Sequence, residues 1–220
     1  SPEIRRYVVE HIRLGWSPEQ ISGRIMIDLP GNTISHEAIY QFIYDPQVRM
    51  NIGNLAQYLR RRYIKRRKKD SSRKSKRVHI HNRVPIELRP PEVNERKELG
   101  HWEGDSMISR DSLTALNTLV ERKSGFTLIT KLDRKTAENT KDVVVKRLGR
   151  LPDYLRKTLT LDNGSENAGH EKITTAIGTA CYFANPYHSW ERGTNENANG
   201  LIRQYFPKGT DFANLSEEDI

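Results

Sequence analysis

The sequence has little that would support disulfide chemistry or membrane insertion. Cys181 is the single cysteine among 220 residues, which excludes an intrachain disulfide and a zinc site built from cysteines. One cysteine fits a reducing cytoplasm. No run of about 18 apolar residues is present, so no transmembrane helix is predicted. The chain starts with neither an apolar leader nor an initiator methionine, so we expect Ser1 to be a processed end or the edge of a fragment.

Apolar residues are also sparse, at 35% of the chain against 30% charged residues. Nine Tyr, five Phe and three Trp are nevertheless enough to form cores, so we expect a folded protein. The length leaves room for one large domain or two small ones.

Most of the chain lacks excess charge of either sign. Residues 1–59 and residues 81–220 each carry a net charge of −1, whereas residues 60–80 carry +11 and so account for the whole excess of +9. Positive charge concentrated in one short segment indicates a polyanion partner.

Residues 1–59 show the apolar spacing of short helices and two helix starts. Ser17 is an expected N-cap with proline directly after it, and Gln20 completes a capping box. Ser35 is the expected N-cap of a further helix. Two capped helices joined by a tight turn predict a helix-turn-helix domain.

The helix that begins at Ser35 is the candidate for insertion into the major groove of DNA. Its expected DNA-contacting residues are Ser35, His36, Glu37, Tyr40 and Gln41. An ordinary small helical bundle would show the same spacing, but the adjacent basic segment favours DNA binding.

Residues 60–95 are predicted to be a basic linker or arm, because the basic run contains too few apolar residues to bury a face. Its cations are expected to neutralise DNA phosphates, so added salt should weaken binding. They are Arg60, Arg61, Arg62, Lys65, Arg66, Arg67, Lys68, Lys69, Arg73, Lys74, Lys76 and Arg77. A solvated tail and a nuclear-localisation signal are alternative interpretations of the same composition.

Residues 96–220 show a change to alternating strands and helices. Strands are expected at 101–108, 115–121, 126–132, 158–161 and 180–184, and helices at 137–148, 171–177 and 194–205. This order predicts an α/β domain with a mixed five-stranded sheet.

Three acidic residues of this domain occupy positions suited to metal-dependent phosphodiester chemistry. Asp105 lies on the first expected strand, with Glu103 on the same face. Asp162 comes directly after an apolar strand, and Glu196 lies on the last helix. Such acids can together hold two Mg²⁺ ions. Glu103 is an alternative to Asp105 as a metal-binding acid, and Glu166 and Glu191 are alternatives to Glu196.

The motifs GHWEGD, TLDNGSE and YFANPYHSWERGTNENANGLIRQYFPKGTDF resemble DDE transposases of bacterial insertion sequences, specifically the IS-thirty family. The resemblance covers nearly the whole chain. It implies a ribonuclease-H-like (retroviral-integrase-like) catalytic domain after an all-α helix-turn-helix domain. It also implies that Asp105, Asp162 and Glu196 are the catalytic and metal-binding triad, with 33 residues between the last two. Asn167 departs from the family pattern, in which an aromatic residue usually follows the second acid's motif.

By this resemblance the protein binds the terminal inverted repeats of an insertion sequence and catalyses strand cleavage and strand transfer with two Mg²⁺ ions, for which Mn²⁺ substitutes. Its partners would be element and target DNA, bound by a homodimer or larger assembly in the cytoplasm at the bacterial nucleoid. Family members carry further N-terminal helices and a C-terminal tail, so we expect the chain to be truncated.

Four residues around the third acid are further candidates for DNA contact. They are Trp190, Arg192, Asn199 and Arg203. Trp190 could stack on an unpaired base or plug its own loop. His188 could position a phosphate or lie at the surface, and Asn163 could orient Asp162 or make the turn.

Two other functions fit the same sequence. One is another integrase or nuclease of the same fold, although a helix-turn-helix is of no use to a nuclease without sequence preference. The other is a sequence-specific DNA-binding repressor with a non-catalytic α/β domain, which leaves three converging acids unexplained.

Overall fold

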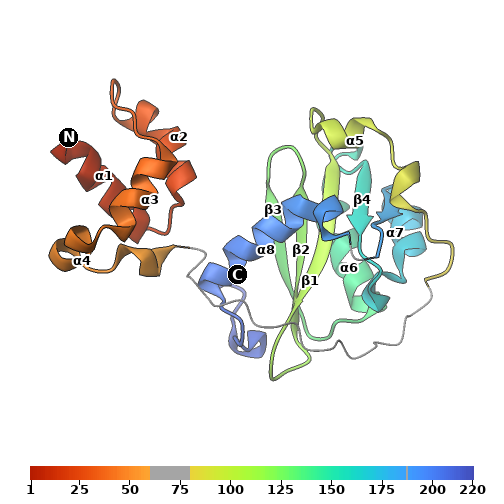
Figure 1. Cartoon of the computed structure of the whole chain (residues 1–220). Helices are drawn as coiled ribbons and strands as arrows, with labels where there is room; N and C mark the ends of the chain where they lie inside the picture. Colours follow the sequence, from red (N-terminus) through yellow and green to blue (C-terminus); the bar gives the residue numbers. More distant parts are fainter. Residues whose placement is uncertain (60–79, 187) are drawn as a thin grey trace. The chain divides into compact units, whose positions relative to one another are not determined.

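The computed structural model describes residues 1–59, 80–186 and 188–220 (Figure 1). The contacts between residues divide the chain into two compact units, and the division falls inside residues 60–79. The basic residues 60–77, which we predicted to contact DNA, lie outside the described residues. Among the helices of the described ranges, none has the length and hydropathy needed to cross a membrane.

The first unit is all-α, as predicted. Its helices are α1 (Pro2–Arg13), α2 (Pro18–Asp28), α3 (His36–Tyr44), α4 (Pro46–Ile52) and the 3₁₀ turn η1 (Leu55–Tyr58). Ser17 caps α2 with the complete capping box, and the hydroxyl of Ser35 caps α3 by accepting from the Ala38 N–H at 3.2 Å. Ile12, Ile25 and Ile39 are fully buried between these helices. The two helices expected from the sequence and the turn that joins them are therefore present.

The second unit is an α/β domain around one sheet. Its strands are β1 (His101–Ile108), β2 (Ala115–Glu121), β3 (Thr127–Leu132), β4 (Thr158–Leu161) and β5 (Ala180–Phe183). They lie in the order β3-β2-β1-β4-β5. The pairs β1–β2 and β2–β3 are antiparallel, whereas β1–β4 and β4–β5 are parallel. The predicted α/β class with a mixed five-stranded sheet is confirmed.

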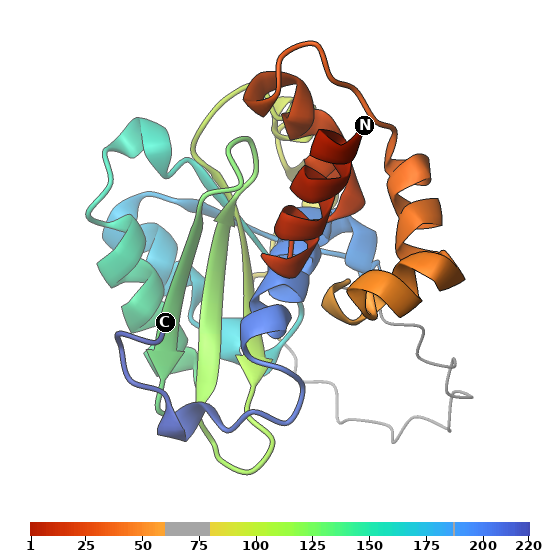
Figure 2. The same cartoon turned by 90° about the vertical axis from the view of Figure 1, so that its left-hand side faces the viewer.

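Helices cover both faces of the sheet (Figure 2). The second unit contains the helices α5 (Glu92–Glu95), α6 (Ala137–Leu148), α7 (His170–Ile177) and α8 (Gly193–Tyr205). Val144 of α6 and Ile173 of α7 belong to the core that contains Trp102 of β1. Ile202 of α8 packs on the other face with Met107 of β1. Successive residues of β1 therefore alternate between the two cores, which places Glu103 and Asp105 on the face that α8 covers.

Residues 80–95, which we predicted to be part of a linker, belong to the second unit. Ile80 lies in the sheet's core, and Val93 is fully buried. Arg89 is 7% exposed and donates to the Thr160 hydroxyl at 2.8 Å. The boundary at residue 96 was therefore placed too late, because the proline-rich sequence at 89–91 marks a bend within the domain and not its start.

Candidate active site

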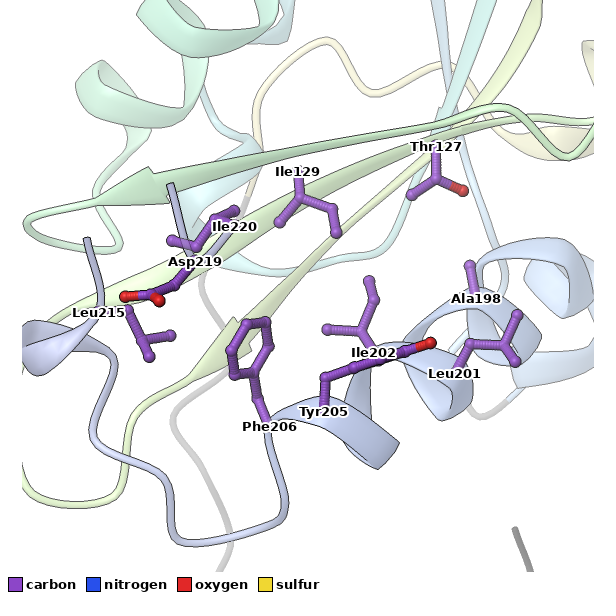
Figure 3. A pocket seen from close by; sticks show the side chains of 10 residues that line it. All are labelled: Thr127, Ile129, Ala198, Leu201, Ile202, Tyr205, Phe206, Leu215, Asp219 and Ile220. Carbon is purple, nitrogen blue, oxygen red and sulfur yellow. The ribbon is translucent and has the colours of Figure 1, made fainter. Parts of the chain in front are cut away.

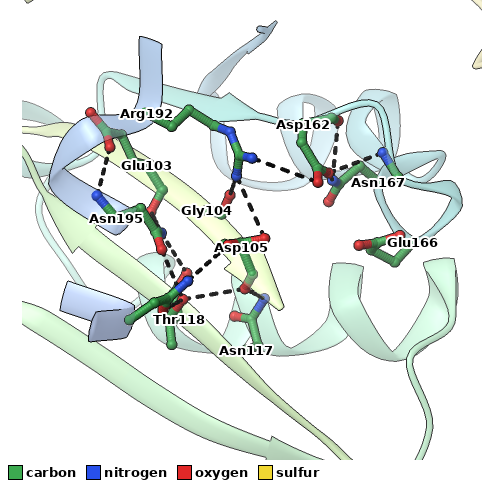
Figure 4. Close-up of polar contacts among 12 residues, drawn as sticks. Glu103, Gly104, Asp105, Asn117, Thr118, Asp162, Glu166, Asn167, Arg192 and Asn195 are labelled. Atoms are coloured by element: carbon green, nitrogen blue, oxygen red, sulfur yellow. Dashed lines mark hydrogen bonds and ion pairs between the residues drawn. The ribbon is translucent and has the colours of Figure 1, made fainter. Parts of the chain in front are cut away.

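Asp105 lies on β1 beneath α8, and protein groups fix one of its two carboxylate oxygens (Figure 4). The side-chain amide of Asn199 on α8 donates to Oδ2 of Asp105 at 2.8 Å. The amide oxygen of Asn199 in turn accepts from the Thr118 hydroxyl on β2 at 3.0 Å. Three elements of the fold thus determine how this carboxylate is oriented.

Asp162 lies beside Asp105 because of the register of two parallel strands. Glu103 on β1 pairs with Thr160 on β4, and continuing that register by two residues brings Asp105 next to Asp162. Oδ1 of Asp162 accepts from the Gly164 N–H at 3.0 Å and from the Asn167 amide at 2.7 Å. Asn167 thus supplies a side-chain hydrogen bond that orients Asp162.

Arg192 lies between the two carboxylates (Figure 4). Its Nη1 is 3.5 Å from Oδ1 of Asp105, and its Nη2 is 3.7 Å from Oδ2 of Asp162. Nη1 also donates to the Gly104 carbonyl at 3.1 Å. Each aspartate therefore has one oxygen held by neighbouring amides and its other oxygen facing the same guanidinium.

Burial raises the pKa of the Asp105 carboxyl above its ordinary value. The positive charge of Arg192 opposes that rise, while the negative charge of Asp162 adds to it. Two acids in one partly buried site disfavour each other's charged forms, so an ionised pair needs a cation nearby. The site is thus electrostatically suited to bind positive charge.

The rival carboxylates have protein partners of their own. Glu103 is fully buried, is paired with Arg122 and accepts from the Asn195 backbone N–H at 2.8 Å. Glu166 is 4% exposed and lies 2.6 Å from Lys135. Glu191 accepts from the Asn185 backbone N–H at 2.7 Å. Each of the three acids thus has a close partner within the protein, whereas Asp105 and Asp162 face Arg192 only at 3.5 Å and 3.7 Å.

Glu196 is exposed on α8. In the part of the chain that the structure describes, no group of three or more His, Cys, Asp or Glu side chains is arranged to hold a metal ion. The structure thus brings together two of the three predicted acids, and the role of Glu196 stays a prediction.

The expected DNA-contacting residues of α3 are mostly exposed. His36, Glu37 and Gln41 lie at the surface, and Ser35 is exposed while it caps the helix. Tyr40 is half-buried and donates its hydroxyl to Glu19 at 3.2 Å. Their contact with DNA stays a prediction.

The candidates around α8 have a different placement from the one expected. Arg192 and Asn199 contact the aspartates instead of an exposed surface. Arg203 donates to the Phe206 carbonyl at 3.4 Å and lies 5.3 Å from the centre of the Phe212 ring, so its described contacts stabilise the end of the helix. The side chain of Trp190 lies outside the described set.

The two weaker candidates also have local partners. Asn163 donates to the Ala184 carbonyl at 2.7 Å and accepts from Arg83, so it ties its loop to neighbouring segments. His188 lies 3.2 Å from Glu191. Neither contact reaches Asp162.

Sequence reasoning missed Asn195, which anchors α8 to the sheet. Asn195 is fully buried, and its amide donates to the Glu103 carbonyl at 2.9 Å and to the Thr118 carbonyl at 3.3 Å. Asn195 and Asn199 are four residues apart on one helix, so they share a face. That spacing was the available signal for a polar helix face turned toward the sheet.

A separate apolar cavity of about 640 Å³ lies between β3 and α8 (Figure 3). It is lined by Thr127, Ile129, Ala198, Leu201, Ile202, Tyr205, Phe206, Leu215, Asp219 and Ile220. Asp219 is the single carboxylate in this lining, so the cavity lacks the paired acids found between β1 and β4.

The chain is similar along almost its whole length to transposases of insertion sequences. It is 39% identical over 226 residues to the transposase InsI of element IS30A from Escherichia coli K12, a match that covers 99% of this chain and 58% of the relative. It is 39% identical to the transposase of IS4351 from Bacteroides fragilis, covering 100% of this chain and 66% of the relative. The chain belongs to the IS30 family of transposases.

A third relative is consistent with this IS30 (IS-thirty) membership. The transposase of IS1086 from Cupriavidus metallidurans is 41% identical and is matched over 93% of this chain and 61% of its own length. The chain thus spans about three fifths to two thirds of these relatives. A solved structure, the catalytic core domain of BIV integrase, is 20% identical and covers 52% of this chain and 77% of that one, with a TM-score of 0.40. No family model matches.

Proposed function

We propose that this IS30-family chain carries the DNA-binding and catalytic parts of a DDE transposase that cuts and joins DNA strands at the ends of an insertion sequence. The observation that carries the proposal is the pair Asp105 and Asp162, each of which turns one free carboxylate oxygen toward the same cationic group.

The donor chemistry of this pair fits a hard divalent cation, because Mg²⁺ and Mn²⁺ both bind carboxylate oxygens. Asp105 and Asp162 would hold the metal, and Glu196 would complete the set. When bound, two Mg²⁺ ions supply an activated water and stabilise the leaving oxygen of the phosphodiester. Glu196 is three residues before Asn199 on α8, so the two are neighbours on the helix surface, which supports its assignment.

The chain's own residues prepare the two carboxylates for this chemistry. Asn199 holds Oδ2 of Asp105, and Asn167 holds Oδ1 of Asp162, so that the other oxygen of each acid is left for a cation. Glu103 and Asn195 keep α8 against the sheet and so keep Asn199 over Asp105. Direct attack by water or by a DNA 3′-hydroxyl requires no Ser, Tyr or Cys nucleophile.

DNA recognition is assigned to the first unit and to the basic residues 60–77. The exposed residues of α3, among them His36 and Gln41, would contact base edges of the terminal inverted repeats. The Lys and Arg of 60–77 would contact the phosphate backbone. Joining two element ends and a target favours a homodimer or larger assembly, working in the cytoplasm at the nucleoid.

Cleavage of DNA that carries the native element ends tests the proposal. Wild type should nick these ends in Mg²⁺ or Mn²⁺ and not in a chelator. Asp105→Asn, Asp162→Asn and Glu196→Gln should each lower the rate about a thousandfold or more while DNA binding is retained. Asp142→Asn is the matched control, because Asp142 lies on α6 with its side chain 62% exposed.

Two results would change the assignment. Full activity of Glu196→Gln would move the third role to Glu191 or Glu166. Tight binding of the ends without cleavage would favour the repressor function.

A further inference from the structure

The cation between the two aspartates is a side chain of the protein itself. Arg192 is the residue directly before the first turn of α8, and its side chain is 15% exposed. Its Nε is buried and has no hydrogen-bond partner within the described residues. A guanidinium placed this way is only partly satisfied by its surroundings.

The contacts of Arg192 with the aspartates are loose. The distances of 3.5 Å and 3.7 Å exceed the usual range for a direct N–H···O hydrogen bond. The one shorter contact runs to the Gly104 carbonyl at 3.1 Å. Arg192 thus neutralises both carboxylates from a distance without binding either in the bidentate mode that arginine favours.

A divalent metal would need the same oxygens at much shorter range. Mg²⁺ binds carboxylate oxygens at about 2.0–2.1 Å. Oδ1 of Asp105 and Oδ2 of Asp162 are the oxygens that face Arg192, whereas the amides of Asn199 and Asn167 hold the other two. A guanidinium and a divalent cation cannot both occupy that position without repulsion.

We propose that Arg192 is the resident counter-cation of this site, which holds Asp105 and Asp162 together before metal binds and is displaced when metal binds. This inference rests on the proposed function, since that function places a divalent metal on these carboxylates. Arg192 is then a positioning residue: it prevents repulsion between the two acids in the metal-free protein and lowers the affinity for metal. Metal loading is thereby coupled to a movement at the start of α8.

Calorimetric titration with Mn²⁺, without DNA, tests the inference. Arg192→Gln should bind Mn²⁺ about tenfold more tightly than wild type, because the metal no longer competes with a resident charge. Arg203→Gln is the matched control on the same helix, since the described contacts of Arg203 are with Phe206, Pro207 and Phe212, and its affinity should equal that of wild type. In chelator, Arg192→Gln should melt at a lower temperature than wild type. Mn²⁺ should raise the melting temperature of Arg192→Gln by more than it raises that of wild type.

A second measurement uses the wild-type side chain directly. The ¹⁵N signal of Arg192 Nε, assigned by its loss in Arg192→Lys, should shift during Mg²⁺ titration, while that of Arg203 should stay in place. This readout serves equally if Arg192→Gln fails to fold.

The possible outcomes distinguish failure of this inference from failure of the proposed function on which it rests. Equal or weaker Mn²⁺ binding by folded Arg192→Gln, or an unmoved Arg192 signal at saturating metal, would overturn the counter-cation role. If Asp105→Asn abolished binding in that case, the proposed metal site would still stand. Absence of Mn²⁺ binding in wild type and Arg192→Gln alike would overturn the metal site and the competition together.

Discussion

The side-chain amide of Asn199 donates a hydrogen bond of 2.8 Å to Oδ2 of Asp105, from the last long helix to the central strand of the sheet. Because Thr118 fixes the amide oxygen of Asn199, the orientation of the amide is determined from the side of β2 as well. Asn199 is therefore a support for the carboxylate of Asp105, and its contact with DNA stays a prediction.

Asn199→Ala should lower the cleavage rate about 10- to 100-fold, because a carboxylate that has lost its orienting partner holds metal less well. The Mg²⁺ concentration for half-maximal cleavage should rise, whereas the affinity for element-end DNA should stay unchanged. Asn197→Ala, at an exposed position of the same helix, is the control. Loss of DNA affinity with an unchanged metal requirement would instead indicate direct contact of Asn199 with DNA.

Arg122→Met should destabilise the second unit by about 3–5 kcal/mol, because it leaves the buried Glu103 carboxylate without its cation. Denaturant unfolding monitored by circular dichroism measures the loss. Lys157→Ala breaks a far more exposed pair with Glu98 and should remain close to wild type. Similar unfolding midpoints for both variants would mean that the Glu103 pair does not anchor α8.

Asp105 should make the metal-free protein less stable as the pH rises. Its folded-state pKa is raised mainly by burial, so the stability that its neutral form contributes is present at low pH and is lost as pH rises through the folded pKa. Asp105→Asn lacks this loss. The difference in melting temperature between Asp105→Asn and wild type is measured in chelator. This difference (variant minus wild type) should increase as the pH rises above 3.8, the ordinary pKa of an aspartate. A difference that is flat or falls with pH would contradict the assignment, and Asp142→Asn gives the baseline.

Cys181 should be inert in the folded protein. It is 5% exposed, and burial raises the pKa of its thiol to about 11, so almost no thiolate forms at pH 8. A colorimetric thiol reagent at that pH should react with none of the native protein and with one thiol per chain after unfolding in guanidinium. Rapid reaction of the native chain would show that β5 opens readily.

The helices and strands were predicted well because their sequence signals lie within a few neighbouring residues. The predicted strand 101–108 and helix 137–148 are found with the same bounds, and the capping box at Ser17 and Gln20 is complete. Alternation along β1 also placed Glu103 and Asp105 on one face, which the structure confirms. The neighbourhood of Asp105 and Asp162 also depends on the parallel register of β1 and β4, because Asp105 lies within β1 and Asp162 directly after β4.

Partnerships between distant segments were not predictable in the same way. Nothing near Arg192 in the sequence indicates that its guanidinium lies between acids 87 and 30 residues away. Polar side chains in and next to a helix are usually solvated, so Arg192 and Asn199 were assigned to DNA. The segment 80–95 was assigned to a linker for a similar reason, because its contacts come from strands that follow it much later in the chain.

The packing of residues 80–95 has a consequence for rearranging the protein by design. The Phe183 N–H donates to the Val84 carbonyl at 2.9 Å, and Pro85 forms a β-bridge with Phe183, so this segment lies along β5 at the edge of the sheet. A chimera that fused a foreign DNA-binding domain at residue 96 would expose the backbone of that edge to other chains. A junction ahead of Ile80 would transplant the second unit together with the segment that covers its β5 edge.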